Sequence, residues 1–86
     1  MDLYKVILKP SVEKDFKRLD RNLIQRILSA IEGLAKNPFP PSSKKLVGAK
    51  NTFRIRIGDY RIVYTYVPTI KTIEVQAIKH RKDVYR

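Results

Sequence analysis

The sequence predicts an α+β fold in which two N-terminal helices pack on one face of a small, mostly antiparallel sheet of about four to five strands. Two observations predict this class. In the first half of the chain, apolar residues recur at the helical period; in the second half, β-branched and aromatic residues alternate with polar ones. Because the helical patterns precede a run of hairpin-linked strands, we expect both helices on the same face. Residues 1–86 are expected to form a single domain.

The first half is expected to hold a strand and two helices. The strand is expected over residues 3–9, ended by Pro10, and is followed by a short helix that Ser11 can cap. Asp20 can cap a second helix, which stops before Pro38. The apolar stripe of this second helix comprises Leu23, Ile24, Ile27, Leu28, Ile31, Leu34 and Ala35. Such a wide stripe predicts that the helix buries one face against the sheet.

The second half is expected to hold strands and turns. We expect a short strand over residues 45–47 and a hairpin over residues 52–67 that turns at Gly58. Residues 70–79 are rich in β-branched side chains and predict a last strand. Residues 80–86 are expected to form a polar tail.

The hairpin collects arginines on one face of the sheet. Glycine at the first position of a two-residue turn takes a positive φ, and this turn pairs Arg56 with Arg61. Since side chains alternate along a strand, Arg54 shares their face. The opposite, apolar face comprises Phe53, Ile55, Ile57, Tyr60, Ile62 and Tyr64. Like charges opposite each other destabilise a strand pair, whereas a guanidinium donates two parallel hydrogen bonds to phosphate. The hairpin therefore predicts a phosphate-binding face.

The composition is strongly basic and poor in metal ligands. A net charge of +11 favours nucleic acid, an anionic membrane or an acidic protein as the partner. The chain has no cysteine and one histidine, which excludes disulfides and makes a zinc site unfavourable. Its eight acidic residues are scattered, which argues against a two-metal nuclease. We expect a site without a metal or cofactor, no membrane span and no signal peptide.

The basic stretch 79–86 adds two candidate site residues. His80 is the natural general acid or base, because histidine is the residue type whose unperturbed pKa lies in the physiological range. Tyr85 can stack on an unpaired base or hydrogen-bond a phosphate. Alternatively, Arg56 and Arg61 are solvated surface charges or pair with Asp59 or Glu74, His80 is an ordinary surface residue and Tyr85 anchors the tail.

Three segments, residues 45–48, 53–64 and 80–85, together resemble the RelE/ParE toxin superfamily and are closest to its RelE branch. The central segment reads Phe-Arg-Ile-Arg-Ile-Gly-Asp-Tyr-Arg-Ile-Val-Tyr and the last reads His-Arg-Lys-Asp-Val-Tyr. The resemblance implies a cytoplasmic toxin of a type II toxin–antitoxin pair. RelE members of this kind cut mRNA in the ribosomal A site without metal: the ribose 2′-OH attacks the neighbouring phosphate.

The resemblance also implies roles for individual residues. Arg61 and Arg81 match the phosphate-binding arginines of the family, Tyr85 matches its C-terminal tyrosine, and His80 lies beside that group. Arg56 is expected to stabilise charge in the reaction. The residues expected to bind RNA phosphates are Arg54, Arg56, Lys44, Lys45 and Lys50.

The identity of the general base stays open. Arg54 and Arg56 stand where RelE enzymes often have lysine, and an arginine does not give up its proton. Lys44 also replaces an acidic residue that some relatives carry. The candidates for the base are His80, Tyr85, Lys44, Lys50 and the ribosome itself.

The resemblance implies four partners: the ribosome, mRNA, a RelB-like cognate antitoxin and, for the toxin–antitoxin complex alone, operator DNA. The antitoxin is expected to use an acidic or amphipathic segment to cover the arginine face or displace the C-terminal tail. Two rival interpretations remain. One is a ParE-like inhibitor of DNA gyrase, and the other is an inactive, basic RNA-binding module.

Overall fold

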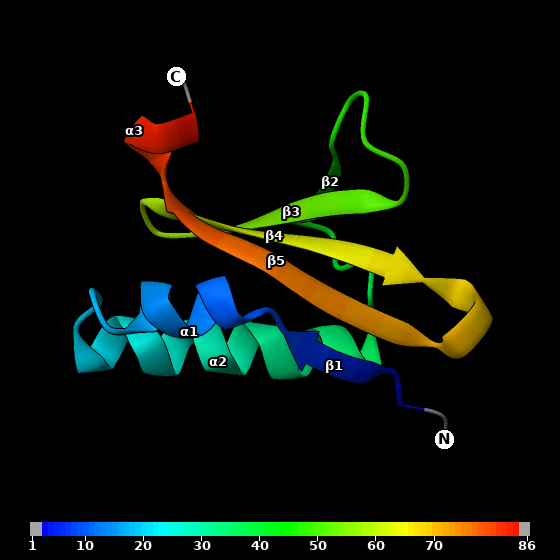
Figure 1. Cartoon of the computed structure of the whole chain (residues 1–86), viewed down its shortest axis with the longest axis horizontal. Helices are drawn as coiled ribbons and strands as arrows, with labels where there is room; N and C mark the ends of the chain where they lie inside the picture. Colours follow the sequence, from blue (N-terminus) through cyan, green and yellow to red (C-terminus); the bar gives the residue numbers. More distant parts are fainter. Residues whose placement is uncertain (1–2, 85–86) are drawn as a thin grey trace.

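The computed structural model describes residues 3–84, with side chains over residues 3–82, as an α+β fold (Figure 1). In chain order the elements are β1 (Lys5–Leu8), α1 (Pro10–Phe16), α2 (Arg21–Lys36), β2 (Lys44–Lys45), β3 (Thr52–Ile57), β4 (Tyr60–Val67), the 3₁₀ turn η1 (Pro68–Ile70), β5 (Thr72–His80) and α3 (Arg81–Val84). No helix within the described residues is long and apolar enough to cross a membrane.

The strands form one five-stranded sheet in the order β1-β5-β4-β3-β2. β1 runs parallel to β5, and every other neighbouring pair is antiparallel. α1 and α2 lie on one face of this sheet, whereas α3 and the loop around β2 lie on the other (Figure 1). The predicted fold class and the placement of both long helices on one face are confirmed.

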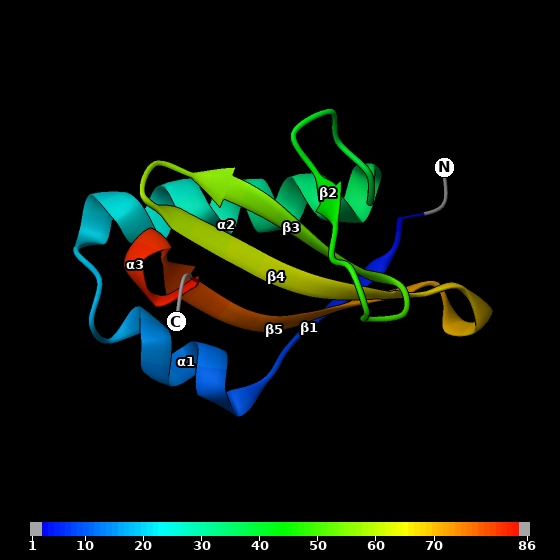
Figure 2. The ribbon, with the colours of Figure 1, turned by 90° about the horizontal axis from the view of Figure 1, so that it is seen from above.

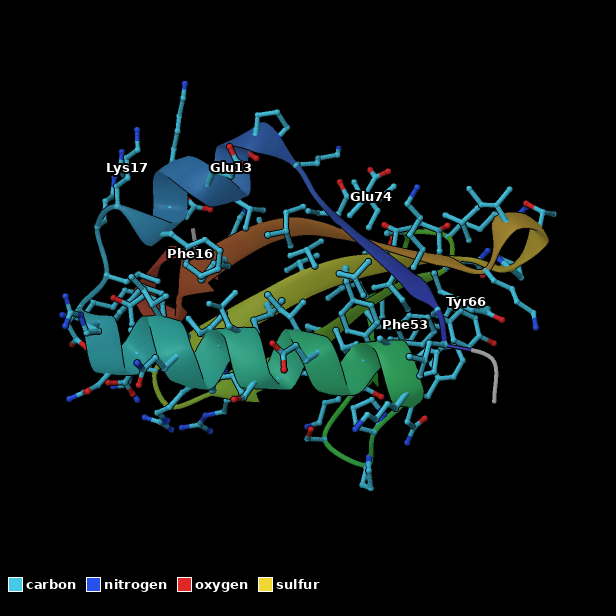
Figure 3. The ribbon with its side chains drawn as sticks, turned by 90° about the horizontal axis from the view of Figure 1, so that it is seen from below. Glu13, Phe16, Lys17, Phe53, Tyr66 and Glu74 are labelled. Carbon is cyan, nitrogen blue, oxygen red and sulfur yellow. The ribbon has the colours of Figure 1, made fainter. Side chains whose placement is uncertain are left out.

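The core lies between α2 and the sheet. The helix contributes Ile27, Ile31 and Leu34, which are buried at the predicted stripe positions. Burying side chains of this size stabilises the fold by about 1.5–3 kcal/mol each. From the sheet the buried residues are Ile55, Ile62, Tyr64, Ile73, Val75 and Ile78. Figure 3 shows Phe16 of α1 pointing inward and Phe53 and Tyr66 near the C-terminal end of α2, at the margins of this core.

Tyr64 is a polar residue within the core. Its ring is fully buried, and its hydroxyl donates a hydrogen bond of 2.6 Å to the carbonyl oxygen of Pro38. Burial raises the pKa of the Tyr64 phenol above 10.0, its ordinary value. The hydrogen bond joins the loop after α2 to the centre of the sheet.

The β3–β4 hairpin has the predicted register. Arg56 lies opposite Arg61, Ile55 opposite Ile62 and Arg54 opposite Val63. Gly58 takes a φ of +59° in the turn, as the two-residue turn requires. The arginines and the apolar residues of the hairpin therefore lie on opposite faces of the sheet, as predicted.

α1 covers the part of β5 that β1 leaves unpaired. β1 pairs only with the first residues of β5, up to Val75. Beyond that point the Asp15 carboxylate accepts a hydrogen bond of 3.2 Å from the backbone N–H of Ile78, and the Ser11 hydroxyl donates one of 3.5 Å to the carbonyl of Gln76. A helix against a strand edge blocks pairing with other chains. Ser11 thus bonds to β5; the prediction that it caps α1 is wrong, since that position is Lys9, which provides no side-chain cap.

The remaining boundaries differ from the prediction in part. Asp20 caps α2 as predicted, its Oδ1 accepting from the N–H of Leu23 at 2.8 Å. The last strand begins two residues late, at Thr72, because residues 68–70 form η1 and Lys71 takes a φ of +46°. β1 is shorter than predicted, and β2 begins one residue earlier than predicted and ends two residues earlier. Residues 81–84 of the predicted polar tail form α3.

Candidate functional site

A small hollow on the sheet face opposite α1 and α2 gathers the arginines of the hairpin. Ser42, Lys44, Arg54, Arg56 and Arg61 line this hollow, which has a volume of about 100 Å³. Lys44 of β2 pairs directly with Arg54 of β3, and Arg56 pairs with Arg61 across the hairpin. Three neighbouring strands therefore hold these cations side by side. We call the face that carries them the open face.

A second hollow of about 420 Å³ adjoins the first and shares Arg56 and Arg61 with it. Arg81 and Lys82 of α3 complete its lining. The backbone N–H of Arg81 donates a hydrogen bond of 2.7 Å to the carbonyl of Asp59, which joins the start of α3 to the hairpin turn. In Figure 2, α3 lies over the sheet at the hairpin end of the open face. We call the two hollows together the arginine site.

Within the arginine site, Arg61 has an unsatisfied donor. Its Nη1 atom is buried and has no hydrogen-bond partner within the described residues. A buried donor without a partner costs about 1–3 kcal/mol. By contrast, the Nε of the exposed Arg56 donates a hydrogen bond of 2.9 Å to the carbonyl of Gly58, which orients that guanidinium. Arg61 therefore lines two basic hollows while one of its nitrogens has no partner among the described residues, which suits an anionic ligand.

The arginines are not neutralised by the acids named as alternatives. Within residues 3–82, no ion pair joins Arg56 or Arg61 to Asp59 or Glu74. Glu74 lies 3.7 Å from the ammonium of Lys9 instead, and one of its oxygens accepts a hydrogen bond of 2.9 Å from Gln76. Figure 3 shows Glu74 beside β1, across the sheet from the hairpin turn. Among the described side chains, the positive charge of the arginine site is therefore uncompensated.

His80 does not lie in the arginine site. It pairs with Tyr60 across β4 and β5, and the two rings meet edge to face with centroids 5.0 Å apart. Tyr60 packs against the core, so His80 faces the helix side of the sheet. It lines a separate hollow of about 410 Å³ together with Asp15 and Arg18 from the α1 region.

A β-bulge explains the side on which His80 lies. Val63 pairs with Ala77 whereas the next residue, Tyr64, pairs with Val75, so Gln76 is an extra residue in β5. Before the bulge the apolar residues of β5 that face the helices are Ile73 and Val75. After it the residues on that face are the buried Ile78 and the half-buried His80. Lys79 consequently shares the face of Arg61, and His80 is turned away from it.

The other predicted site residues divide into three groups. Lys44 joins the arginines, while Lys45 and Lys50 line a hollow of about 350 Å³ within the loop from β2 to β3. Tyr85 lies outside the described residues. Ser42 and Lys82 also line the site. Lys82 belongs to the basic stretch 79–86 that was expected to add to the site, although it was not singled out, whereas no sequence signal marks Ser42.

Comparisons with known proteins agree with this architecture. Residues 6–85 match the family model described as the ParE toxin of a type II toxin–antitoxin system. Toxin RelE3 of Methanocaldococcus jannaschii is 32% identical over 85 residues, which cover 94% of each chain.

Two solved structures share the fold at similar identity. The archaeal RelE–RelB complex from Pyrococcus horikoshii OT3 gives a TM-score of 0.83 at 29% identity, covering 94% of this chain and 97% of that chain. The RelB–RelE antitoxin–toxin complex from Methanococcus jannaschii gives 0.77 at 28% identity, covering 92% and 94%. The chain therefore belongs to the RelE/ParE toxin superfamily and is a toxin of a type II toxin–antitoxin system.

Proposed function

We propose that this toxin is a metal-independent endonuclease that cuts mRNA on the ribosome, with the arginine site holding the phosphate at the point of cleavage. The observation that carries the proposal is the gathering of cations around two adjoining hollows, where one buried nitrogen of Arg61 has no hydrogen-bond partner within the described residues. A phosphate bound there would neutralise the facing charges, and a small movement of the Arg61 side chain would let its unpartnered Nη1 donate to a phosphate oxygen. The likeness to RelE toxins supports the same reaction class.

The proposed reaction needs charge stabilisation more than any other assistance. The ribose 2′-oxygen bonds to the adjacent phosphorus, and the bond from phosphorus to the 5′-oxygen breaks. The products are a 2′,3′-cyclic phosphate and a 5′-OH; the proton of the 2′-OH goes to a base, and the 5′-oxygen takes up a proton. Arg54, Arg56, Arg61 and Arg81 would stabilise the additional charge on the phosphorane, as fixed donors do in other phosphoryl transfers.

Proton transfer requires a residue other than arginine. Among the predicted candidates within the described residues, Lys44 is the one that lines a hollow with the arginines, and its amine can exchange a proton. His80 lines a different hollow, and Lys50 lies in the β2–β3 loop. We therefore propose Lys44 for proton transfer, together with groups that the ribosome provides.

The proposed partners follow from the same site. A RelB-like cognate antitoxin would neutralise the toxin by covering the open face or displacing the C-terminal segment with an acidic or amphipathic chain. The two structural neighbours from Pyrococcus horikoshii and Methanococcus jannaschii are themselves RelE–RelB complexes. Action on translating ribosomes would place the toxin in the cytoplasm, and binding to operator DNA would belong to the toxin–antitoxin complex.

The test is a primer-extension assay of mRNA cleavage with and without translating ribosomes. We expect cuts within A-site codons for the wild type, and a loss of about a hundredfold or more for Arg61→Ala, because one missing donor at a developing charge has this effect. Arg21→Ala removes the same charge from the exposed start of α2 and should cut normally. Equal cleavage by Arg61→Ala and Arg21→Ala would contradict the proposed site.

Inhibition of DNA gyrase is the second candidate function, favoured by the match to the ParE family model. A supercoiling assay decides between the two. Inhibition of gyrase by a toxin that leaves mRNA intact on ribosomes would replace the nuclease proposal. A folded toxin that binds RNA without either activity would instead be an inactive binding module.

A further inference from the structure

We propose that His80 is a positioning residue: its imidazole caps α3 and thereby holds Arg81 and Lys82 in the arginine site. This inference rests on the proposed function of that site as a phosphate-binding surface. It gives His80 a role other than the predicted acid–base catalysis, through contacts on the helix side of the sheet.

The first contact is a capping hydrogen bond. The backbone N–H of Lys82 donates to Nδ1 of His80 at 3.2 Å. His80 directly precedes α3, and Lys82 is the second residue of that helix, so the bond has the connectivity of an N-cap. A helix of four residues is too short to be stable alone and depends on such contacts.

The second and third contacts fix the junction between β5 and α3. The ring of His80 rests against Tyr60 at an interplanar angle of 88°. The next residue, Arg81, bonds through its N–H to the carbonyl of Asp59 in the hairpin turn. The chain therefore leaves β5 with His80 on one face of the sheet and with Arg81 and Lys82 lining the hollow on the other.

The capping bond specifies the state of the imidazole. To accept from Lys82, Nδ1 must be unprotonated, so the neutral ring carries its proton on Nε2. An imidazolium donates from both nitrogens and has no acceptor for a backbone N–H. The charged residues that line the same hollow are Asp15, Arg18 and Lys79, and the side chain of Lys79 lies on the face of Arg61.

Paired substitutions separate capping from ring packing and from catalysis. Asparagine is among the best capping residues but does not titrate, so His80→Asn keeps the acceptor. His80→Phe keeps a ring against Tyr60 but has no acceptor. The probe is a fluorescent single-stranded RNA oligonucleotide, whose affinity for the antitoxin-free toxin is measured by anisotropy at fixed salt. We expect affinity to fall by about threefold to tenfold for His80→Phe and by less than about twofold for His80→Asn.

Two further readouts come from NMR spectroscopy and do not depend on RNA. In the wild type we expect the Nε2–H tautomer of His80 and a protected Lys82 amide; hydrogen exchange of that amide should accelerate in His80→Phe but not in His80→Asn. Arg61→Ala should weaken RNA binding while leaving the Lys82 amide protected. If the wild type binds no free RNA, the cleavage assay on translating ribosomes still tests the proposed function, and the Lys82 amide still tests the cap.

Two results would overturn the positioning role. One is a His80→Phe variant with wild-type amide exchange and wild-type RNA affinity. The other is a His80→Asn variant that binds RNA normally but no longer cleaves it, which would return His80 to acid–base catalysis.

Discussion

The two faces of the β3–β4 hairpin differ in how completely their groups are satisfied. On the helix side, Ile55 is 3% exposed and Ile62 is fully buried, and the hydroxyl of Tyr64 has its acceptor. On the open face, Arg56 lies opposite Arg61, and one buried nitrogen of Arg61 has no partner in the part of the chain that the structure describes. Alternate residues of the hairpin therefore have different roles. The apolar residues on the helix side stabilise the fold, whereas the arginines on the open face lower its stability and are placed to bind an anionic ligand.

The largest expected change in the free energy of unfolding comes from placing a threonine first on the helix side and then on the open face of β4. Ile62→Thr leaves a cavity and buries a hydroxyl, so it should lower the free energy of unfolding by roughly 2–5 kcal/mol. Val63, the next residue of β4, lies on the open face. Because threonine has nearly the shape of valine, Val63→Thr should lower the free energy of unfolding by less than about 1 kcal/mol. Urea denaturation measures both. Equal losses at the two positions would remove the distinction between the faces.

A smaller change in the free energy of unfolding is expected when the hydroxyl of Tyr64, on the helix side, is removed. Tyr64→Phe removes the hydrogen bond to Pro38 and should cost about 1 kcal/mol near neutral pH. Because burial raises the pKa of Tyr64 in the folded state, its contribution is fully present below pH 10 and is lost as the pH rises above that value. Urea denaturation between pH 8 and 11 should therefore show the difference between the two proteins shrinking; a constant difference would contradict this account.

The smallest effect is expected from the facing arginines. Arg56→Gln and Arg56→Lys both lose the hydrogen bond to Gly58, but only the glutamine removes the charge opposite Arg61. At low salt the glutamine variant should be the more stable of the two by about 0.2–1 kcal/mol. The difference should vanish near 1 M salt, where charges are screened within about 3 Å. A lysine variant of equal or greater stability would show that the pair is not repulsive.

Local signals in the sequence were sufficient for much of this fold. The two-residue turn at Gly58 sets the hairpin register and therefore the face of every arginine in it. The stripe of α2 and the Asp20 cap depend on residues close in sequence, and both are confirmed.

Features that depend on distant contacts could not be predicted in the same way. The bulge at Gln76 is defined only by pairing with β4, yet it decides which face His80 occupies. α3 is stabilised by hydrogen bonds to Asp59 and His80 rather than by helix propensity. The sequence alone therefore predicts a polar tail for residues 81–84. Ser42 reaches the arginine site through the course of a loop, and Lys71 takes a conformation that its type does not favour.

The most direct test of the difference between the two faces is to measure stability and RNA affinity for Arg61→Gln in parallel. Loss of a charge-assisted contact to phosphate should weaken binding of single-stranded RNA by about tenfold to a hundredfold. Removing a cation with an unpartnered donor should leave the free energy of unfolding within about 0.5 kcal/mol of the wild type, or raise it. Unchanged RNA affinity together with a loss of stability would mean that Arg61 supports the fold rather than a ligand, and would contradict the proposed phosphate site.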